Sequence, residues 1–389
     1  MAAVTVRSRP PPWRDVRVLR IVFQLAFLAA VGLLLLFLYF NLSANLRRLG
    51  IDTSFDYLDQ RAGFAIADSD FRSTQSLQAA LAVGVENTAK VAFTGIVLAT
   101  ILGVVVGVAR LSPNWLVRRA AALYVESLRN VPVLVIILFW YLGVLLRLPP
   151  ITRAREWLDL IVISNRGLAV PWPARTGELG LFLALLAVAA SVAVAVALWR
   201  TRRFDATGEP HHRVLWAGGA LLGGLVLAYL VSGRPVTVGT PERGDLASAG
   251  GLRLSPEYGA LLIALTLYTA SHIAEIVRGS ILAVPRGQGE AADALGLSAF
   301  QRLRFVVLPQ AFRISIPPIA NQYLNLTKNS SLGVAIAYPE VTRITRIAIG
   351  QQAPAPQAVL VLMGIYLFFS LVIALVMNLI NRRLTLKGR

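Results

Sequence analysis

Polar side chains within an otherwise apolar segment mark the place where this sequence could bind a solute. Asn321, Asn325 and Lys328 recur at i, i+4 and i+7, and Ser331 continues the polar run, all within a segment at 314–338. This spacing predicts that the two amides and the ammonium share one face of a helix. Placing such a face in hydrocarbon costs free energy unless its polar groups contact water or a polar partner. We expect it to line a path for a solute with a carboxylate, which the lysine would attract.

Other ionisable residues in apolar segments leave a second interpretation open. Lys328 could form an ion pair with Glu86 or Glu275 and would then only join helices. It could also extend along the helix so that its ammonium reaches water at the membrane surface. Glu126 and Arg129 stand three residues apart near the end of another apolar segment, at a spacing that allows an ion pair on one helical face. We expect these two residues to lie at the gate of the solute path.

The sequence carries no pattern for hydrolysis or metal binding. None of its lysines, Lys90, Lys328 and Lys387, follows the glycine pattern of a P-loop, so we expect ATP to be hydrolysed by another polypeptide. The patterns H-E-x-x-H and G-x-S-x-G are absent from the sequence, and there is no cysteine. His211 and His212 lack a third ligand at suitable spacing, which favours a solvated surface over a metal site. We therefore expect no catalytic residue, no metal and no cofactor in this chain.

A long polar segment, residues 286–309, separates two apolar segments and is expected to form two short helices. Gly287 and Gly289 are expected to precede the first helix, which Glu290 opens with a negative charge in the first turn, where the helix dipole favours an anion. Gly296 then supplies the left-handed residue that ends many helices. The first helix is therefore predicted to be short and to end in a tight turn.

The second short helix is predicted from a capping pattern. Ser298 and Gln301 have the S-x-x-Q spacing of a capping box, so a new helix should begin directly after the turn. Apolar residues then recur at helical spacing, and the helix is expected to end before Pro309. The segment is thus predicted to be a helix, a glycine turn and an amphipathic helix.

The rest of the sequence is dominated by apolar segments long enough to cross a membrane. Of 389 residues, 56% are hydrophobic and 15% charged, and the mean hydropathy is +0.65, which indicates an all-α integral membrane protein. Eight transmembrane helices are predicted, at about residues 21–40, 85–109, 131–147, 179–199, 214–232, 257–275, 314–338 and 358–380. The fourth and fifth have almost no polar side chains and are expected to face lipid and packing partners.

The distribution of lysine and arginine orients these spans. With eight spans, both termini lie on the same side of the membrane as the polar segment 286–309, and this side holds more Lys and Arg than the other. The positive-inside rule therefore places both termini in the cytoplasm. The formal net charge of +18 is explained by this topology, so no nucleic acid partner is expected.

The polar segment resembles a motif of a known family. The sequence EAA at 290–292, Gly296 and the sequence V-x-L-P at 306–309 resemble the EAA loop, E-A-A-x3-G-x9-I-x-L-P, of permease subunits of bacterial ABC importers, with valine where isoleucine is usual. The flanking sequences GVENTAKVAF, YVESLRNVP and NLTKNSSLG further resemble polar-amino-acid permeases of the histidine/glutamine type. Among these, the chain is most like the general L-amino-acid transporter permease subunits, which have an enlarged middle. The resemblance covers roughly residues 85–385.

The resemblance implies a type I ABC importer permease core in the bacterial inner membrane. It also implies that this permease subunit is not itself an enzyme. It assigns ATPase coupling to the EAA-loop residues Gly289, Glu290, Ala291, Ala292, Gly296, Leu308 and Pro309. The implied partners are ABC ATPase subunits that bind the ATP, a second permease subunit that is a copy or a relative, and a periplasmic amino-acid-binding protein. An amino-acid substrate and membrane lipid complete the implied partners.

Three regions are expected along the chain. They are residues 1–84, with the cytoplasmic tail, first span and periplasmic loop, 85–383, with the permease domain and an extra region at about 148–256, and 384–389, the cytoplasmic C-terminal tail. The alternative function is an ATP-independent secondary transporter of amino acids. A secondary transporter would have interrupted spans at corresponding places in the two halves of an inverted repeat. The sequence has only one strongly interrupted span, which favours the ATP-driven importer.

Overall fold

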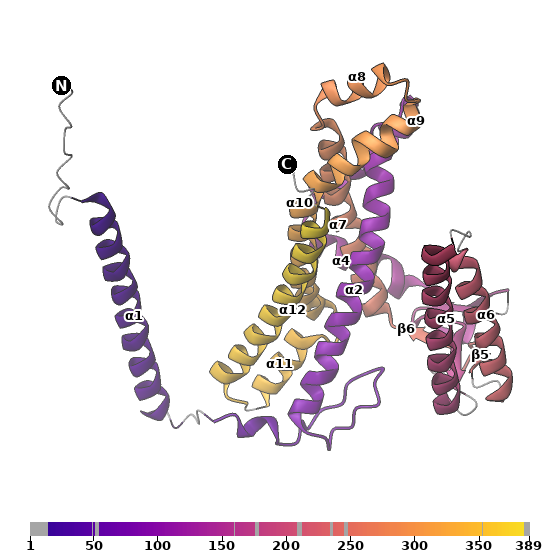
Figure 1. Ribbon diagram of the computed structural model, residues 1–389. Coiled ribbons are helices and arrows are strands. Elements are labelled where there is room, and N and C mark those ends of the chain that lie inside the picture. Colours follow the sequence, from indigo (N-terminus) through magenta and orange to yellow (C-terminus); the bar gives the residue numbers. More distant parts are fainter. Residues whose placement is uncertain are drawn as a thin grey trace, which may run out of the picture. The chain divides into compact units, whose positions relative to one another are not determined.

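The computed structural model describes residues 15–384 apart from 49, 51–53, 159, 176–178, 208–211, 234–235, 245–247 and 352 (Figure 1). The outer parts of both expected tails, residues 1–14 and 385–389, and His211 lie outside the described residues. The chain divides into two compact units, Met1–Gly84 with Ile344–Leu367 and Val85–Arg343 with Phe368–Arg389.

The first unit contains a long apolar helix and a folded loop. Helix α1, Val16–Arg48, is long and apolar enough to cross a membrane, which confirms the first predicted span. The 3-10 helix η1, Asp56–Leu58, follows in the next loop, where Tyr57, Ile66 and Phe71 are buried. The predicted loop between the first two spans is therefore folded rather than extended.

Three long helices form the core of the second unit: α2, Leu77–Ala109, α7, Pro256–Leu282, and α10, Leu308–Asn329. Two glycines of α2 allow it to approach α7 closely. A Cβ added at Gly103 would lie 2.7 Å from Ile273 Cβ, and one added at Gly107 would lie 2.7 Å from the carbonyl oxygen of Ala274. Helices in a membrane associate mainly through such close packing, because lipid offers no hydrophobic driving force between them.

The third predicted span, 131–147, is the second half of a bent pair of helical segments. Helix α3, Trp115–Arg129, is followed by α4, Val133–Leu138, the π-helical turn η2, Phe139–Val144, and the 3-10 turn η3, Leu145–Arg147. The two halves of this broken pair meet at 104°. Pro132 explains the break, because proline cannot donate a backbone hydrogen bond and restricts the residue before it. The bend therefore lies at the start of the predicted span, and it was not predicted from the sequence.

The inserted region carries two small antiparallel sheets that the sequence did not predict. It begins with the 3-10 turn η4, Ile151–Arg153. One sheet has the strand order β1-β2-β3-β6, with strands Arg155–Trp157, Ile161–Ser164, Gly167–Val170 and Leu252–Leu254. The other sheet pairs β4, Trp172–Arg175, with β5, Val236–Gly239. Val162 lies opposite Ala169 in the larger sheet, and both side chains are buried with Ile151 and Ala154.

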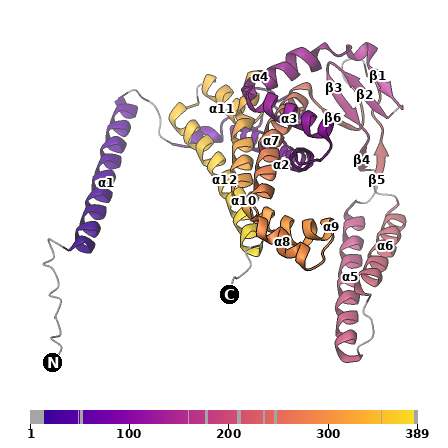
Figure 2. The same cartoon turned by 90° about the horizontal axis from the view of Figure 1, so that it is seen from above.

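Helices α5, Leu179–Thr207, and α6, Arg213–Val231, extend from the smaller sheet and lie side by side (Figure 2). Both are long and apolar enough to cross a membrane, which confirms the two added spans. An added Cβ at Gly224 would lie 2.4 Å from Ala189 Cβ, so small residues bring the two helices together. Most leucine and valine side chains on their outer faces are exposed, as expected for contact with lipid.

Six helices in the described residues are long and apolar enough to cross a membrane, or seven when the bent pair counts as one span. The predicted number of eight is therefore not reached. Helix α10 occupies the seventh predicted position, but it carries too many polar residues to qualify, and after Asn329 it tightens into the 3-10 helix η6, Ser330–Ile336. The chain ends with α11, Val341–Gly350, and the apolar helix α12, Ala355–Leu384.

Candidate functional site

The polar segment after α7 begins with a helix that starts earlier than its sequence suggests. Helix α8, Arg286–Ala294, begins directly after Pro285, so Gly287 and Gly289 lie inside the helix rather than before it. That prediction was wrong because a helical glycine costs only about 1 kcal/mol relative to alanine, which neighbouring contacts can offset. Glu290 consequently lies in the middle of α8 and not in its first turn.

The turn that follows α8 confirms the local prediction. Gly296 has a φ of +73°, its backbone N–H donates to the Asp293 carbonyl at 3.0 Å, and the N–H of Leu297 donates to the Ala292 carbonyl at 3.1 Å. These two hydrogen bonds are those of a Schellman motif, in which a left-handed residue satisfies the last helical carbonyls. No atom lies within 4 Å of a Cβ added at Gly296, so backbone conformation rather than space selects glycine here.

The second helix begins with the predicted capping box but does not end where expected. The N–H of Ser298 donates to Gln301 Oε1 at 2.9 Å, and the N–H of Gln301 donates to Ser298 Oγ at 3.3 Å. Helix α9, Ala299–Arg302, continues through the π-helical turn η5, Leu303–Val307, directly into α10. Pro309 does not stop the helix because it lies in the first turn of α10, where a missing N–H is tolerated.

Side-chain contacts hold α8 and α9 together as one body at the end of the helices α7 and α10 (Figure 1). Arg302 Nη1 lies 2.5 Å from Asp293 Oδ2, and Gln310 Nε2 donates to Gln288 Oε1 at 3.1 Å. Ala292 is buried beneath this pair of helices. Glu290, Ala291, Leu295 and Phe300 are all exposed, Leu295 to 80%. The pair of short helices therefore exposes a carboxylate and apolar side chains that a partner could contact, and it is continuous with the core helix α10.

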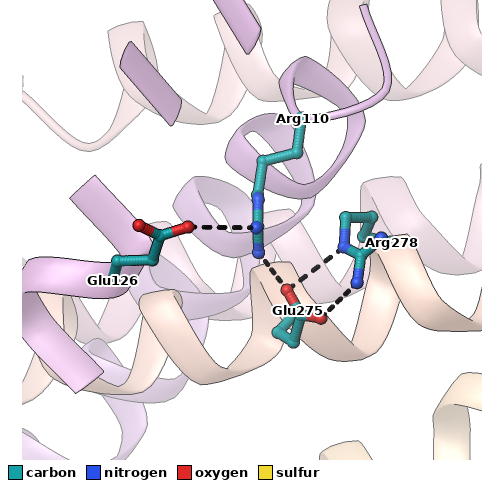
Figure 3. Close-up of polar contacts among 4 residues, drawn as sticks. All are labelled: Arg110, Glu126, Glu275 and Arg278. Atoms are coloured by element: carbon teal, nitrogen blue, oxygen red, sulfur yellow. Dashed lines mark hydrogen bonds and ion pairs between the residues drawn. The ribbon is translucent and has the colours of Figure 1, made fainter. Parts of the chain in front are cut away.

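An ion-pair cluster joins three helices of the same unit close to the end from which α8 departs (Figure 3). Glu275 of α7 accepts hydrogen bonds from Arg110, which directly follows α2, and from Arg278, whose Nη2 lies 2.6 Å from Glu275 Oε1. Arg110 Nη2 also lies 3.9 Å from Oε1 of Glu126 on α3. The side chain of Arg110 is only 14% exposed, so its charge depends on these two carboxylates.

This cluster corrects the predicted gate pair. Glu126 contacts Arg110 rather than Arg129, and no ion pair of Arg129 occurs in the described part of the chain. Arg129 is exposed. Arg110 was not among the residues predicted from the sequence, although it stands as a single cation directly after the last apolar residue of a span. Such a cation requires either water or a carboxylate from another helix.

The polar stripe of α10 lies on one exposed face. Asn321, Asn325 and Lys328 are all exposed, whereas Leu326 and Thr327 are buried against the core. Tyr323 fixes this rotation of α10, because its hydroxyl lies 2.7 Å from Thr100 Oγ1 on α2. Ser331 is half-buried and donates to the Lys328 carbonyl at 2.7 Å, at the start of η6. Asn321, Asn325 and Lys328 therefore face outward together.

The interpretation in which Lys328 pairs with a buried carboxylate is wrong. Glu86 is bound to Lys90, with Lys90 Nζ 2.8 Å from Glu86 Oε1, and Glu275 is held by its arginines. Within the described residues, Lys328 makes no ion pair, and its side chain is exposed. In the same residues, no three His, Asp or Glu side chains form a group that could hold a metal ion.

Comparisons with known proteins identify the family. A family model described as "Binding-protein-dependent transport system inner membrane component" matches residues 256–386. The chain is 44% identical to the General L-amino acid transport system permease protein AapQ of Rhizobium johnstonii, over 90% of this chain and 88% of that protein. It is 39% identical to the Putative amino-acid ABC transporter permease protein YhdX of Escherichia coli, over 94% of each chain.

A third relative comes from a system with two related permeases. The Glutamate/glutamine/aspartate/asparagine transport system permease protein BztB of Rhodobacter capsulatus is 37% identical over 95% of this chain and 94% of its own length. The permease protein BztC of the same system is 49% identical over 72 residues, which are 18% of this chain. Near full-length similarity at these identities, together with several helices apolar enough to cross a membrane, shows that this multi-pass membrane protein belongs to the family of amino-acid ABC transporter permeases.

Proposed function

We propose that this chain forms the solute path of an ATP-driven amino-acid importer and is coupled to a separate ATPase through α8 and α9. The observation that carries the proposal is the rigid body of α8, turn and α9, which is continuous with α10 through η5. A partner that moves this body also moves α10, because no loop lies between them. Glu290 to Gly296 and the residues Gly289, Leu308 and Pro309 make up the proposed coupling segment.

The coupling mechanism follows from the exposed face of this body. A groove on a nucleotide-binding subunit can accept the two short helices, with the Glu290 carboxylate meeting a basic group and Ala291 permitting close approach. Closure of two such subunits on ATP would then displace α8 and α9 and rock the attached core helices between inward and outward openings. ATP is thus bound and hydrolysed by the partner and not by this chain.

The polar face of α10 is the proposed path for the solute. An amino acid carries a carboxylate that the ammonium of Lys328 attracts, and an amine and side chain that the amides of Asn321 and Asn325 can bind. Ser331 adds a hydroxyl near one end of this face. Glu126 and Arg129, both exposed on α3, are proposed to lie near the gate, with Glu126 acting through Arg110.

The partners and placement complete the proposal. They are a pair of ABC ATPase subunits, a second permease and a periplasmic amino-acid-binding protein, in the bacterial inner membrane. BztB and BztC are two permeases of one transport system, which supports a related second permease rather than a second copy of this chain. Both termini and the helices α8 and α9 are proposed to be cytoplasmic. Because six apolar helices alone would place α8 and α9 on the side opposite the termini, this arrangement requires the bent pair and α10 each to cross the membrane. Residues 1–84, 85–383 with the insertion at 148–256, and 384–389 are proposed as the functional regions.

Energy dependence tests this function. In sealed right-side-out vesicles that carry the whole complex, with binding protein and labelled L-amino acids outside, we expect uptake only when ATP is enclosed. The reason is that the ATPase must meet α8 and α9 on the cytoplasmic face. Uptake driven by an imposed ion gradient without nucleotide would establish the secondary transporter instead. Uptake driven by ATP supplied only outside would overturn the proposed orientation.

Replacing Lys328 by Met tests the solute path in the same vesicles. A hydrogen bond to a charged group contributes roughly 1.5 to 3 kcal/mol, so removing the ammonium should lower uptake by about tenfold or more. Assembly with the ATPase should persist, because no carboxylate in the described residues depends on Lys328. Lys90→Met is the matched control, since it removes an exposed ammonium from α2 and should leave uptake unchanged. Equal uptake by both variants would remove Lys328 from the path.

A further inference from the structure

Arginine and tryptophan side chains meet where α5 ends and α6 begins. The guanidinium carbon of Arg200 lies 5.8 Å from the ring centroid of Trp199 on α5 and 5.5 Å from that of Trp216 on α6. The guanidinium carbon of Arg203 lies 5.8 Å from the Trp199 centroid, and Arg202 is exposed beside them. Trp199, Arg200, Arg202, Arg203 and Trp216 are called the hairpin-end cluster.

The two helices fix the position of this cluster. Arg200 contacts an indole on each helix, so its guanidinium bridges α5 and α6. Below it the helices are locked by close packing at Ala189 and Gly224 and by the buried side chain of Ala193. A guanidinium stacked on aromatic faces is more ordered than a long cationic side chain in water, and less entropy is lost when it binds an anion.

The surroundings of the cluster are apolar on one side and basic on the other. Leu198, Val214 and Leu215 flank it, exposed to 55%, 78% and 75%, and among the described residues no other helix packs extensively on this pair. The stretch 199–216 carries more arginines than carboxylates. Tryptophans of this kind are typical of the level of the lipid headgroups, and basic pockets between membrane helices bind anionic headgroups.

We propose that the hairpin-end cluster binds the phosphate of an anionic phospholipid, whose acyl chains lie along the exposed faces of α5 and α6. The phosphate accepts hydrogen bonds from the arginines of the cluster, and the indoles set the depth of the headgroup. The apolar faces of α5 and α6 supply the contact area for the acyl chains, which a soluble anion does not need. The added pair of helices is thereby a lipid-binding element of this chain, independent of which solute the permease carries.

Lipid retention by the complete detergent-purified complex tests this proposal. The double variant Arg200→Gln and Arg203→Gln should retain phosphatidylglycerol about tenfold less tightly than the unaltered complex in native mass spectrometry, with phosphatidylcholine as the neutral reference. Trp216→Leu keeps every charge and should also weaken retention, because it removes one side of the Arg200 contact. The matched control is Arg382→Gln with Arg383→Gln, which removes two exposed arginines from the end of the apolar helix α12.

The outcomes separate a specific site from general attraction. Loss in the cluster variants with retention in the α12 control supports the site, and equal loss in both overturns it in favour of bulk charge. Retention by a cluster variant that assembles normally also overturns it. Inorganic phosphate in the same assay should not displace the lipid, and displacement would assign the cluster to a soluble anion. A protein found on this face in place of lipid would refute the proposal as well.

Discussion

Replacing Gly296 by Val is expected to abolish ATP-coupled uptake while leaving the membrane helices inserted. Gly296 has a φ of +73°, a conformation that a β-branched residue adopts at a cost of about 1 to 3 kcal/mol. The left-handed turn depends on the backbone hydrogen bonds from Gly296 to Asp293 and from Leu297 to Ala292, and we expect the strain to be relieved by breaking them. Helices α8 and α9 would then no longer present one face, and the ATPase should detach or turn over without transport.

The matched control for this variant is Gly296→Asn. Asparagine tolerates the left-handed conformation far better than valine, and no atom lies within 4 Å of a Cβ added at this position. We therefore expect near-normal uptake and co-purification of the ATPase with the asparagine variant. Full uptake by Gly296→Val would show that the turn is not needed for coupling and would remove α8 and α9 from the proposed mechanism.

The coupling segment could be predicted from sequence where its structure depends on neighbours in the chain. The turn at Gly296 and the capping box at Ser298 involve residues within five positions of each other, and both predictions are confirmed. The start of α8 and the continuation past Pro309 were predicted wrongly, because contacts such as Arg302 with Asp293 and the π-helical turn η5 offset weak local preferences.

Features that depend on distant residues could not be predicted in the same way. The apolar spans of α1, α5 and α6, by contrast, could be predicted from composition alone, because a run of about 20 apolar residues has few stable environments other than a membrane. Arg110 and Glu275 are far apart in sequence, and nothing in their local spacing indicated the ion pair between them. The sheet strands of the insertion are three or four residues long and too short for a clear alternation of polar and apolar residues.

Replacing Glu275 by Gln is expected to destabilise the assembled complex by about 3 kcal/mol, the typical effect of leaving a largely buried charge without its partner. Glu275 binds both Arg110 and Arg278, and the side chain of Arg110 is only 14% exposed. The remaining carboxylate near Arg110, that of Glu126, lies 3.9 Å away and is 66% exposed, so it compensates little. The measurement is the fraction of complex that stays assembled in detergent after heating.

Two further variants decide whether the unpaired charge of Arg110 causes this loss of stability. Glu86→Gln removes the ion pair with Lys90, in which the Glu86 side chain is 62% exposed and the Lys90 side chain 56%. This variant should change the stability of the complex by no more than about 0.5 kcal/mol. Arg110→Met combined with Glu275→Gln removes the buried cation and the carboxylate together, and Arg278, 31% exposed, can still reach water. If the buried charge is the cause, this double variant should be more stable than Glu275→Gln alone. If the two losses simply add, packing rather than charge holds α2 to α7, and the cluster would have no electrostatic role beside the coupling segment.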